Sequence, residues 1–261
     1  MARRILNLLE GLLNLVTMLI IVVVGVYSGY ALWDNQQIYD EAGNVQADML
    51  IYKQKAEEID VEAMFAELKE INSDVQAWLT LDNTLIDYPV LQGTSNFSYL
   101  NTNVYGKFAM AGSIFLDSRN TPNFYDQYNL VHGHHMSERK MFGDLDLYKD
   151  KDFFFENRTG TLILEDREYS LRTFAALYCL DMDVTIFEPD RWADDIEEPL
   201  NYVNEISLYK DDEMIRRLLE DNKQFEDEKK PQIIVLATCS VESDASRFVL
   251  LAEMIPVEET E

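Results

Sequence analysis

The segment Pro231–Pro256 reads PQIIVLATCSVESDASRFVLLAEMIP, two apolar runs separated by a short polar stretch. The first run ends at Cys239 and is almost continuously apolar, which is typical of a strand buried on both faces. If the two runs pair as an antiparallel hairpin, Arg247 lies beside Cys239, because cross-strand neighbours are about 5 Å apart. The segment therefore predicts a strand pair that brings a thiol and a guanidinium together at the edge of the core.

Further strand-like runs precede this hairpin, each short, apolar or alternating, and bounded by turn residues. They are VQAWLTL (75–81), TLIDYPVL (84–91), AGSIFLD (111–117), NLVHGHH (129–135), TGTLILE (159–165) and EYSLRTFAALYC (168–179). The polar residues Glu165–Glu168 separate the last two runs in the manner of a hairpin turn. Many short strands with such punctuation predict a closed, mostly antiparallel β domain.

Helical character is found in residues 34–72, in about 141–157 and from about 198 to 225. The first of these stretches carries an apolar stripe at helical spacing, which is expected to pack on the domain. The predicted fold is therefore mainly β, a closed barrel with helical insertions and N-terminal helices.

One uncharged segment predicts the compartment. Residues 11–33 read GLLNLVTMLIIVVVGVYSGYALW, and as a helix rising about 1.5 Å per residue they span the roughly 30 Å hydrocarbon core of a bilayer. Arg3 and Arg4 precede the segment and Asp34 follows it, so the N-terminus is expected in the cytoplasm and the rest outside. A cleaved signal peptide is disfavoured, because its apolar part is usually no longer than about 15 residues. The sequence predicts a single-pass anchor in the cell membrane.

The charge and the cysteine count exclude several classes of protein. The chain carries 48 acidic and 22 basic residues, a net charge of −26, which repels phosphate backbones and argues against nucleic acid binding. A solvated acidic surface explains this charge, and attraction of a cationic partner is the alternative. Two cysteines, Cys179 and Cys239, are too few for a disulfide framework, although one bridge between them stays open. The histidines have no cysteine beside them, so no metal site is predicted.

A nucleophilic cysteine needs a proton partner, and the chain's only histidines are His132, His134 and His135. On a strand, His132 and His134 share one face, so the period of two does not choose between them. A guanidinium such as that of Arg247 lowers the pKa of a neighbouring thiol and stabilises a developing oxyanion. The residues predict a thiol nucleophile, Cys239, with an imidazole partner from this cluster.

Together these segments resemble the class B sortases, cysteine transpeptidases of Gram-positive cell surfaces. The similarity covers most of residues 75–255. It runs through FSYLNTNVYGKFAMAGSIFLDSRN (97–120), NLVHGHHMSERKMFGDLDLY (129–148) and VLATCSVESDASRFVLLAEM (235–254). The family pattern Thr-Leu-x-Thr-Cys corresponds to Val235–Cys239, and the family's Tyr-Gly-His corresponds to His132–His134. The resemblance selects His134 as the acid/base partner and assigns Arg247 to the family's arginine, while Val235 and His132 depart from the pattern.

The resemblance implies a mechanism and its partners. Cys239 attacks the carbonyl that follows a threonine in a C-terminal sorting signal of a secreted protein, and His134 protonates the leaving amine. A peptidoglycan precursor amine then resolves the thioacyl enzyme, while Arg247 stabilises the oxyanion. No metal and no organic cofactor is required. The membrane lipid around residues 11–33 keeps the enzyme where exported substrates arrive.

Residues near this triad are candidates for substrate binding. Thr238 is expected to orient the substrate through its hydroxyl, Asp244 to hold Arg247, and His132 to shape the wall of the site. Plain structural roles are the alternatives, and for Arg247 the alternative is a structural salt bridge to Asp244 or Glu242.

The predicted domains are a cytoplasmic tail (1–10), the anchor (11–33), a helical region (34–72) and the catalytic barrel (73–261). A papain-like hydrolase is disfavoured, because it places its cysteine before its histidine and at a helix N-terminus. A sortase that polymerises pilins and a non-catalytic, membrane-anchored binding module are the remaining alternatives.

Overall fold

The computed structural model describes residues 2–58, 60–225, 230–239 and 246–257. The chain divides into two compact units, residues 1–41 and 42–261. The first unit belongs to one long helix, α1 (Ala2–Glu58), which contains the predicted anchor and is long and apolar enough to be a candidate membrane span. The remainder of α1, from residue 42 onward, belongs to the second unit.

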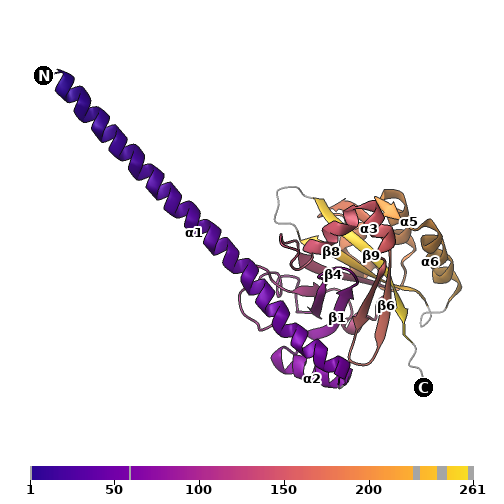
Figure 1. Cartoon of the computed structure of the whole chain (residues 1–261). Coiled ribbons are helices and arrows are strands. Elements are labelled where there is room, and N and C mark those ends of the chain that lie inside the picture. The colour runs from indigo at the N-terminus through magenta and orange to yellow at the C-terminus, as the bar shows by residue number, and fades with distance from the viewer. Residues whose placement is uncertain (1, 59, 226–229, 240–245, 258–261) are drawn as a thin grey trace. The chain divides into compact units, whose positions relative to one another are not determined.

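The second unit is built around a closed barrel (Figure 1). Its strands follow one another in the order β5-β1-β2-β3-β4-β8-β9-β6, and β6 pairs back with β5. Only the β2–β3 and β4–β8 pairs are parallel among the described barrel pairs. The strands are β1 (Val75–Leu81), β2 (Asp87–Leu91), β3 (Ile114–Leu116), β4 (Tyr128–His134), β5 (Thr159–Ile163), β6 (Glu168–Leu180), β8 (Gln232–Cys239) and β9 (Ser246–Pro256). Each predicted run overlaps one of them, so the mostly antiparallel barrel is confirmed.

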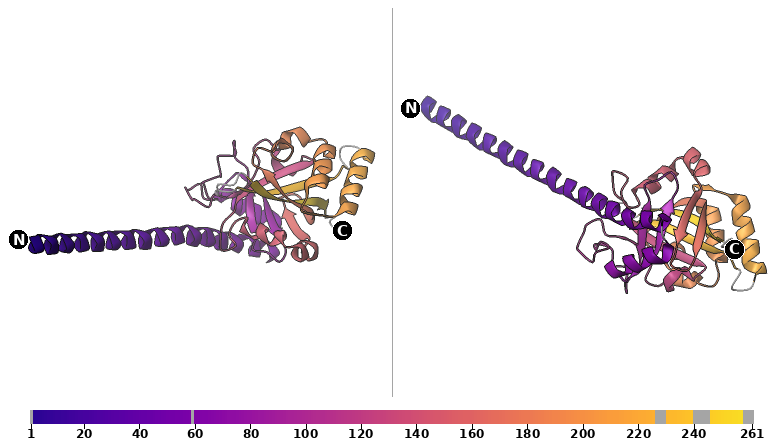
Figure 2. Two further views of the ribbon diagram at one scale, coloured as in Figure 1. Left: turned by 90° about the horizontal axis from the view of Figure 1, so that it is seen from above. Right: turned by 60° about the horizontal axis from the view of Figure 1, so that its bottom comes forward.

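Helices and 3-10 turns connect these strands (Figure 2). They are α2 (Val61–Ile71), η1 (Pro122–Phe124), η2 (Gly143–Lys149), α3 (Lys151–Glu156), α4 (Val184–Phe187), η3 (Pro189–Trp192), α5 (Glu197–Ile206) and α6 (Asp212–Gln224). The helical stretches predicted at 34–72 and 141–157 are confirmed in outline by α1, α2, η2 and α3.

The helix predicted from about 198 to 225 is wrong as a continuous element. It breaks between α5 and α6, where β7 (Tyr209–Lys210) pairs with β6. The Leu208 N–H donates to the Ala176 carbonyl at 2.8 Å, and the Asp211 N–H donates to the Phe174 carbonyl at 2.8 Å. The Asp211 carboxylate then caps α6 by accepting from the Met214 N–H at 3.0 Å. Pairing with the barrel edge therefore replaces the helical bonds at this point.

Strand β8 is buried on both faces, as its apolar run predicts. Ile234 and Leu236 belong to the cluster that includes the barrel interior, whereas Ile233 and Val235 pack in a second cluster with residues of α4, α5 and α6. All four side chains have no exposed surface. A third cluster joins the end of α1 and α2 to β1, through residues such as Phe65 and Trp78.

The chain that leaves β4 makes a tight excursion before η2. Glu138, Arg139 and Met141 all have positive φ, between 52° and 61°, a conformation that side chains disfavour. The Arg139 guanidinium holds the excursion by donating two bonds to the buried Asp144 carboxylate, at 2.7 and 2.8 Å. The Phe142 N–H closes it by donating to the His134 carbonyl at 3.0 Å. This excursion therefore fixes the end of β4.

Gly143 offers a test of that closure. A Cβ on Gly143 meets the Met136 carbonyl oxygen at 2.1 Å, so Gly143→Ala forces backbone apart and should destabilise the protein by about 1–3 kcal/mol or more. Gly106→Ala is the control: Gly106 has φ +70° but open space around it, and the cost should be about 1 kcal/mol. Denaturant unfolding of both variants measures the difference. Wild-type stability in Gly143→Ala would contradict the packing.

Candidate active site

The ends of β4, β8 and β9 meet at one rim of the barrel. In the parallel β4–β8 pair, His134 is the backbone partner of Cys239. In the antiparallel β8–β9 pair the last printed partners are Ala237 and Val249, and the Thr238 hydroxyl extends the contact by bonding the backbone N–H and carbonyl of Phe248, both at 3.2 Å. The same register continued by two residues sets the backbone of Cys239 opposite that of Arg247. The topology thus brings the three predicted residues to one place.

The three histidines have different surroundings. His132 Nε2 lies 2.9 Å from the buried Asp117 carboxylate, and its ring packs between Phe115 and Phe187. His135 Nε2 lies 3.0 Å from the Asp146 carboxylate. His134 instead meets a backbone carbonyl, with Nε2 2.6 Å from the Leu100 oxygen. His134 therefore differs from the other two histidines in its partner, since no described carboxylate bonds to its ring.

This contact determines the tautomer of His134. A carbonyl oxygen only accepts, so Nε2 carries the proton and donates it to Leu100. Nδ1 is buried and has no hydrogen-bond partner among the described residues. In the neutral ring Nδ1 therefore holds an unshared electron pair, which is the state that a general base needs.

Gly133 is required between the two histidines on β4. A Cβ at this position would lie 2.4 Å from Ile114 Cδ1 and 2.7 Å from a ring carbon of Phe142. The inner face of the strand is therefore filled by neighbouring side chains, and the His-Gly-His sequence reflects this packing. His132 and His134 project from the opposite face.

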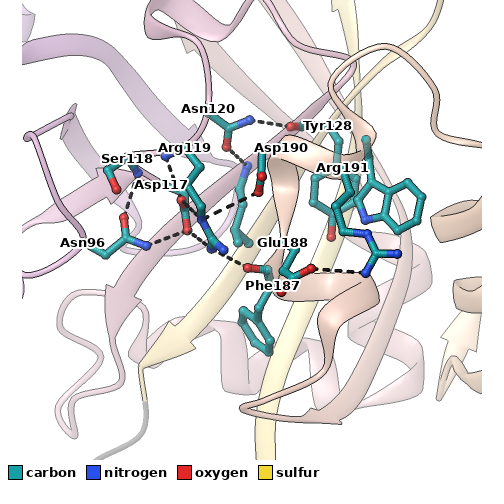
Figure 3. Close-up of polar contacts among 12 residues, drawn as sticks. Asn96, Asp117, Ser118, Arg119, Asn120, Tyr128, Phe187, Glu188, Asp190 and Arg191 are labelled. Carbon is teal, nitrogen blue, oxygen red and sulfur yellow. Dashed lines mark hydrogen bonds and ion pairs between the residues drawn. The ribbon is translucent and has the colours of Figure 1, made fainter.

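Asp117 is the centre of a polar network next to His132 (Figure 3). Its carboxylate has no exposed surface and accepts from the Asn96 amide at 2.8 Å and from the Arg119 guanidinium at 2.9 and 2.8 Å. Burial opposes ionisation, but the bonds from Arg119 and His132 outweigh it and hold the pKa of Asp117 well below its usual range. Arg119 also donates to the Phe187 carbonyl. The network therefore ties β4 to the loop after β2 and to the end of α4.

Arg247 is on β9, which lies between β8, the strand of Cys239, and β6, the strand of Cys179. Its backbone partner on β6 is Cys179, and its guanidinium lies 3.8 Å from the Asp181 carboxylate. Cys179 is a free thiol, and burial, with help from Asp183, raises its pKa to about 12 although Arg247 opposes the shift. A thiol with this pKa is protonated at neutral pH and is a poor nucleophile.

Of the two predicted substrate-binding residues Thr238 and Asp244, the structure describes only the first. Thr238 is buried, and its described hydrogen bonds go to the backbone of Phe248. Asp244 lies outside the described residues, and so does its predicted ion pair with Arg247.

Sequence reasoning missed Asp117, Arg119 and the Leu100 carbonyl. Asp117 ends a strand-like run and resembles an ordinary turn residue. A backbone carbonyl leaves no mark in the residue types, so the tautomer of His134 had no signal at all. The one available hint was the Asp-x-Arg spacing of 117 and 119, which allows a local ion pair.

Comparison with known proteins places this geometry in a family. No family model matches the chain. Sortase B of Listeria monocytogenes is 33% identical over 192 residues, which cover 72% of this chain and 73% of the relative. Sortase B of Staphylococcus aureus is 26% identical over 260 residues, which cover 95% of this chain and 99% of the relative.

Solved structures agree with these relatives. The Staphylococcus aureus sortase B–substrate complex has a TM-score of 0.67 and 27% identity, covering 86% of this chain and 99% of that one. A sortase B complexed with triglycine has a TM-score of 0.70 and 25% identity, covering 84% and 99%. A Streptococcus pyogenes class B sortase involved in pilus biogenesis has a TM-score of 0.61 and 30% identity, covering 73% and 97%.

The fold and these relatives define a sortase-type cysteine transpeptidase. More specifically, the chain belongs to the sortase B family, the class B sortases.

The Asp117 network predicts a pH-dependent stability. Because the folded pKa lies below the unfolded value of about 3.9, the carboxylate stabilises the fold fully above that pH, and this stabilisation is lost as pH falls towards the folded pKa. Asp117→Asn should cost about 2–3 kcal/mol at neutral pH, less than for a fully buried pair, because 40% of the Arg119 side chain is exposed. It should also flatten the loss of stability below pH 4.

The control for this variant is Asp190→Asn. Asp190 also faces Arg119, at 3.9 Å, but is 54% exposed, so the change should cost less than about 1 kcal/mol. Denaturant unfolding between pH 3 and 7 measures both variants. Equal losses from the two substitutions would contradict a special role for the buried carboxylate.

Substitutions of the two cysteines are expected to have different effects on activity. Cys239→Ala should abolish peptide cleavage, whereas Cys179→Ala should keep most of it, because the Cys179 thiol is buried and protonated at neutral pH. Turnover of a fluorogenic peptide measures both, with thermal unfolding to confirm that each variant is folded. A complete loss in folded Cys179→Ala would overturn the assignment of the nucleophile.

Proposed function

We propose that this chain is a membrane-anchored sortase that joins secreted proteins to the cell wall. It cleaves a C-terminal sorting signal after a threonine through a thioacyl intermediate on Cys239, and transfers the acyl group to a peptidoglycan amine. The observation that carries the proposal is the parallel β4–β8 register, which pairs His134 with Cys239. The domains proposed are the cytoplasmic tail (1–10), anchor (11–33), helical region (34–72) and catalytic barrel (73–261).

In the first half of the reaction Nδ1 of His134 takes the proton of the Cys239 thiol, and the resulting thiolate attacks the threonine carbonyl carbon. The carbonyl oxygen becomes an oxyanion, and collapse of this tetrahedral species breaks the C–N bond. The protonated imidazole of His134 gives the Nδ1 proton to the leaving amine, since Nε2 is occupied by Leu100. The products are a thioester on Cys239, a released C-terminal peptide and a neutral His134.

The second half reverses the proton transfer. The incoming amine attacks the thioester carbonyl and gives its proton to Nδ1 of His134. The C–S bond breaks, and the sulfur leaves as a thiolate that the regenerated imidazolium stabilises. The new bond is an amide, and the enzyme returns to its starting state without a metal or an organic cofactor.

Arg247 is the proposed stabiliser of both oxyanions. Its register places it across from Cys239, and its side chain is 21% exposed, so it is partly buried yet still open to a substrate. One described carboxylate, that of Asp181, lies 3.8 Å from the guanidinium and is 39% exposed, which makes this contact a weak ion pair. Thr238, His132 and Asp244 stay proposals for the substrate-binding wall.

The relatives support the proposed partners. A sortase B was solved with its substrate and another with triglycine, a peptide with a free amine. The Streptococcus pyogenes relative is involved in pilus biogenesis, which keeps pilin polymerisation as a second candidate function. The two differ in the amine, which belongs to peptidoglycan in one case and to a pilin lysine in the other.

The candidate span in α1 supports the proposed location. We place residues 11–33 in the cell membrane, the N-terminus in the cytoplasm and the barrel outside. This arrangement confines the enzyme to the surface on which secreted substrates and lipid-linked wall precursors emerge.

The function is tested by supplying both substrates to the full chain. Peptides from the C-terminal tails of secreted proteins encoded in the same genome are incubated with a wall-derived amine or a pilin, and the products are identified by mass spectrometry. We expect cleavage after threonine and transfer to the wall amine. His134→Ala should lower kcat by about 10²–10⁴-fold, and the control His135→Ala should lower it little. Transfer to the pilin alone would favour the second candidate, and no cleavage of any tail would contradict both.

Variants of Arg247 distinguish a role in oxyanion stabilisation from a purely structural role. Arg247→Ala should lower kcat by about 10²–10³-fold with little change in KM, because the contact strengthens only in the transition state. Arg247→Lys should rescue part of the loss, since lysine keeps the charge but not the planar fork. Asp181→Asn is the control and should turn over normally. A folded Arg247→Ala enzyme with wild-type kcat would remove Arg247 from the mechanism.

A further inference from the structure

The loop between β2 and β3 carries a small hairpin over residues 101–110, here called the tip hairpin. The Asn103 N–H donates to the Lys107 carbonyl at 2.9 Å, and the Asn103 side-chain oxygen accepts from the N–H groups of Tyr105 and Lys107, both at 3.1 Å. Gly106 makes the turn with φ +70°. These bonds fix the turn, so the side chains that it displays are held in place.

The second arm of the tip hairpin exposes two large apolar side chains and buries the alanines that follow each of them. Phe108 is 73% exposed and Met110 is 54% exposed, whereas Ala109 and Ala111 are each only 4% exposed. This alternation is the reverse of a surface strand in a soluble protein, in which the large apolar side chains turn inward. Two such side chains on one turn form an apolar protrusion that is open to a partner.

The charge around the hairpin is equally unusual. The chain has 48 acidic residues, yet residues 92–116 contain none, and Lys107 is the single basic residue among them. The acidic remainder of the barrel domain is repelled by an anionic bilayer, but this segment is not. Aromatic and apolar side chains around a lysine are the combination that favours the interface between lipid headgroups and acyl chains.

The hairpin is also tied to the helix that carries the candidate anchor. The Tyr105 hydroxyl donates to the Asp48 carboxylate of α1 at 3.2 Å. Asp48 follows Trp33, where the proposed anchor ends, by fifteen residues, and so few residues reach at most about 50 Å even when fully extended. The tether therefore sets an upper limit on the distance between the tip hairpin and the end of the proposed anchor, and this raises the effective concentration for a weak contact with the bilayer.

We propose that the tip hairpin is a second membrane contact, which inserts Phe108 and Met110 into the outer surface of the bilayer. This inference rests on the proposed anchor but not on the chemistry of the site. It has a consequence for the site, because the hairpin follows directly after Leu100, whose carbonyl bonds His134. Docking thus holds the rim of the active site at the lipid surface, within reach of a lipid-linked amine.

The test uses the full chain in liposomes, with Cys179→Ala and Cys239→Ala to remove the native thiols. A single new cysteine at Lys107→Cys carries an environment-sensitive fluorophore, and a second preparation carries it at Met182→Cys. Met182 is 85% exposed and serves as a matched position outside the hairpin. Each is measured in phosphatidylcholine–phosphatidylglycerol vesicles with and without brominated acyl chains, which quench by contact.

We expect a blue shift and quenching by brominated lipid at position 107, and neither at position 182. Adding Phe108→Ser and Met110→Ser to the Lys107→Cys protein should abolish both signals, while thermal unfolding stays unchanged because both side chains are exposed. Absence of quenching at position 107, or equal quenching at both positions, would overturn the proposal. A blue shift without quenching that grows with protein density would instead identify a second copy of the chain as the partner. A shift that appears only on adding a sorting-signal peptide would identify the substrate. The enzymatic activity is not part of this readout, so failure here leaves the proposed function standing.

Discussion

The parallel pairing of β4 with β8 is the contact on which the proposed site depends. Each strand alone supplies one group, an imidazole or a thiol, and the register from Tyr128 opposite Ile233 to His134 opposite Cys239 carries both to the same end. A shift of one residue would turn His134 to the other face of its strand. The register is protected by burial, because the apolar side chains of β8 are packed on both faces. The packing that stabilises the barrel therefore also maintains the register on which the geometry of the site depends.

The three histidines at the end of β4 have different hydrogen-bond partners. One ring nitrogen of His132 lies beside a carboxylate, and so does one ring nitrogen of His135. His134 keeps one nitrogen for the Leu100 carbonyl and one without a described partner. Asp117 connects this strand to Asn96 and, through Arg119, to the end of α4. The buried Asp117 carboxylate thus connects the loops that border the rim.

Much of this architecture could be predicted from the sequence. The strand runs, the turns between them and the apolar segment in α1 have strong local patterns, and the two apolar runs predicted the hairpin of β8 and β9. The break between α5 and α6 could not be predicted, because it depends on pairing of β7 with a strand distant in sequence. The choice among the histidines needed the family resemblance, since period two leaves His132 and His134 equivalent. The role of Asp117 was hidden for a similar reason: the partners of its carboxylate, Asn96, Arg119 and His132, come from three separate segments.

The most direct test of the account is the ionisation of Cys239. The rate of alkylation of Cys239 is measured against pH in a Cys179→Ala background, and again after His134→Ala and after Arg247→Ala. If the β4, β8 and β9 ends form one electrostatic unit, the thiol should ionise below the usual pKa of about 8.5, and each substitution should change the profile. Loss of Arg247 should raise the apparent pKa, and loss of His134 should remove one of the ionisations. An ordinary cysteine profile that neither substitution alters would contradict the claim that the register couples these groups.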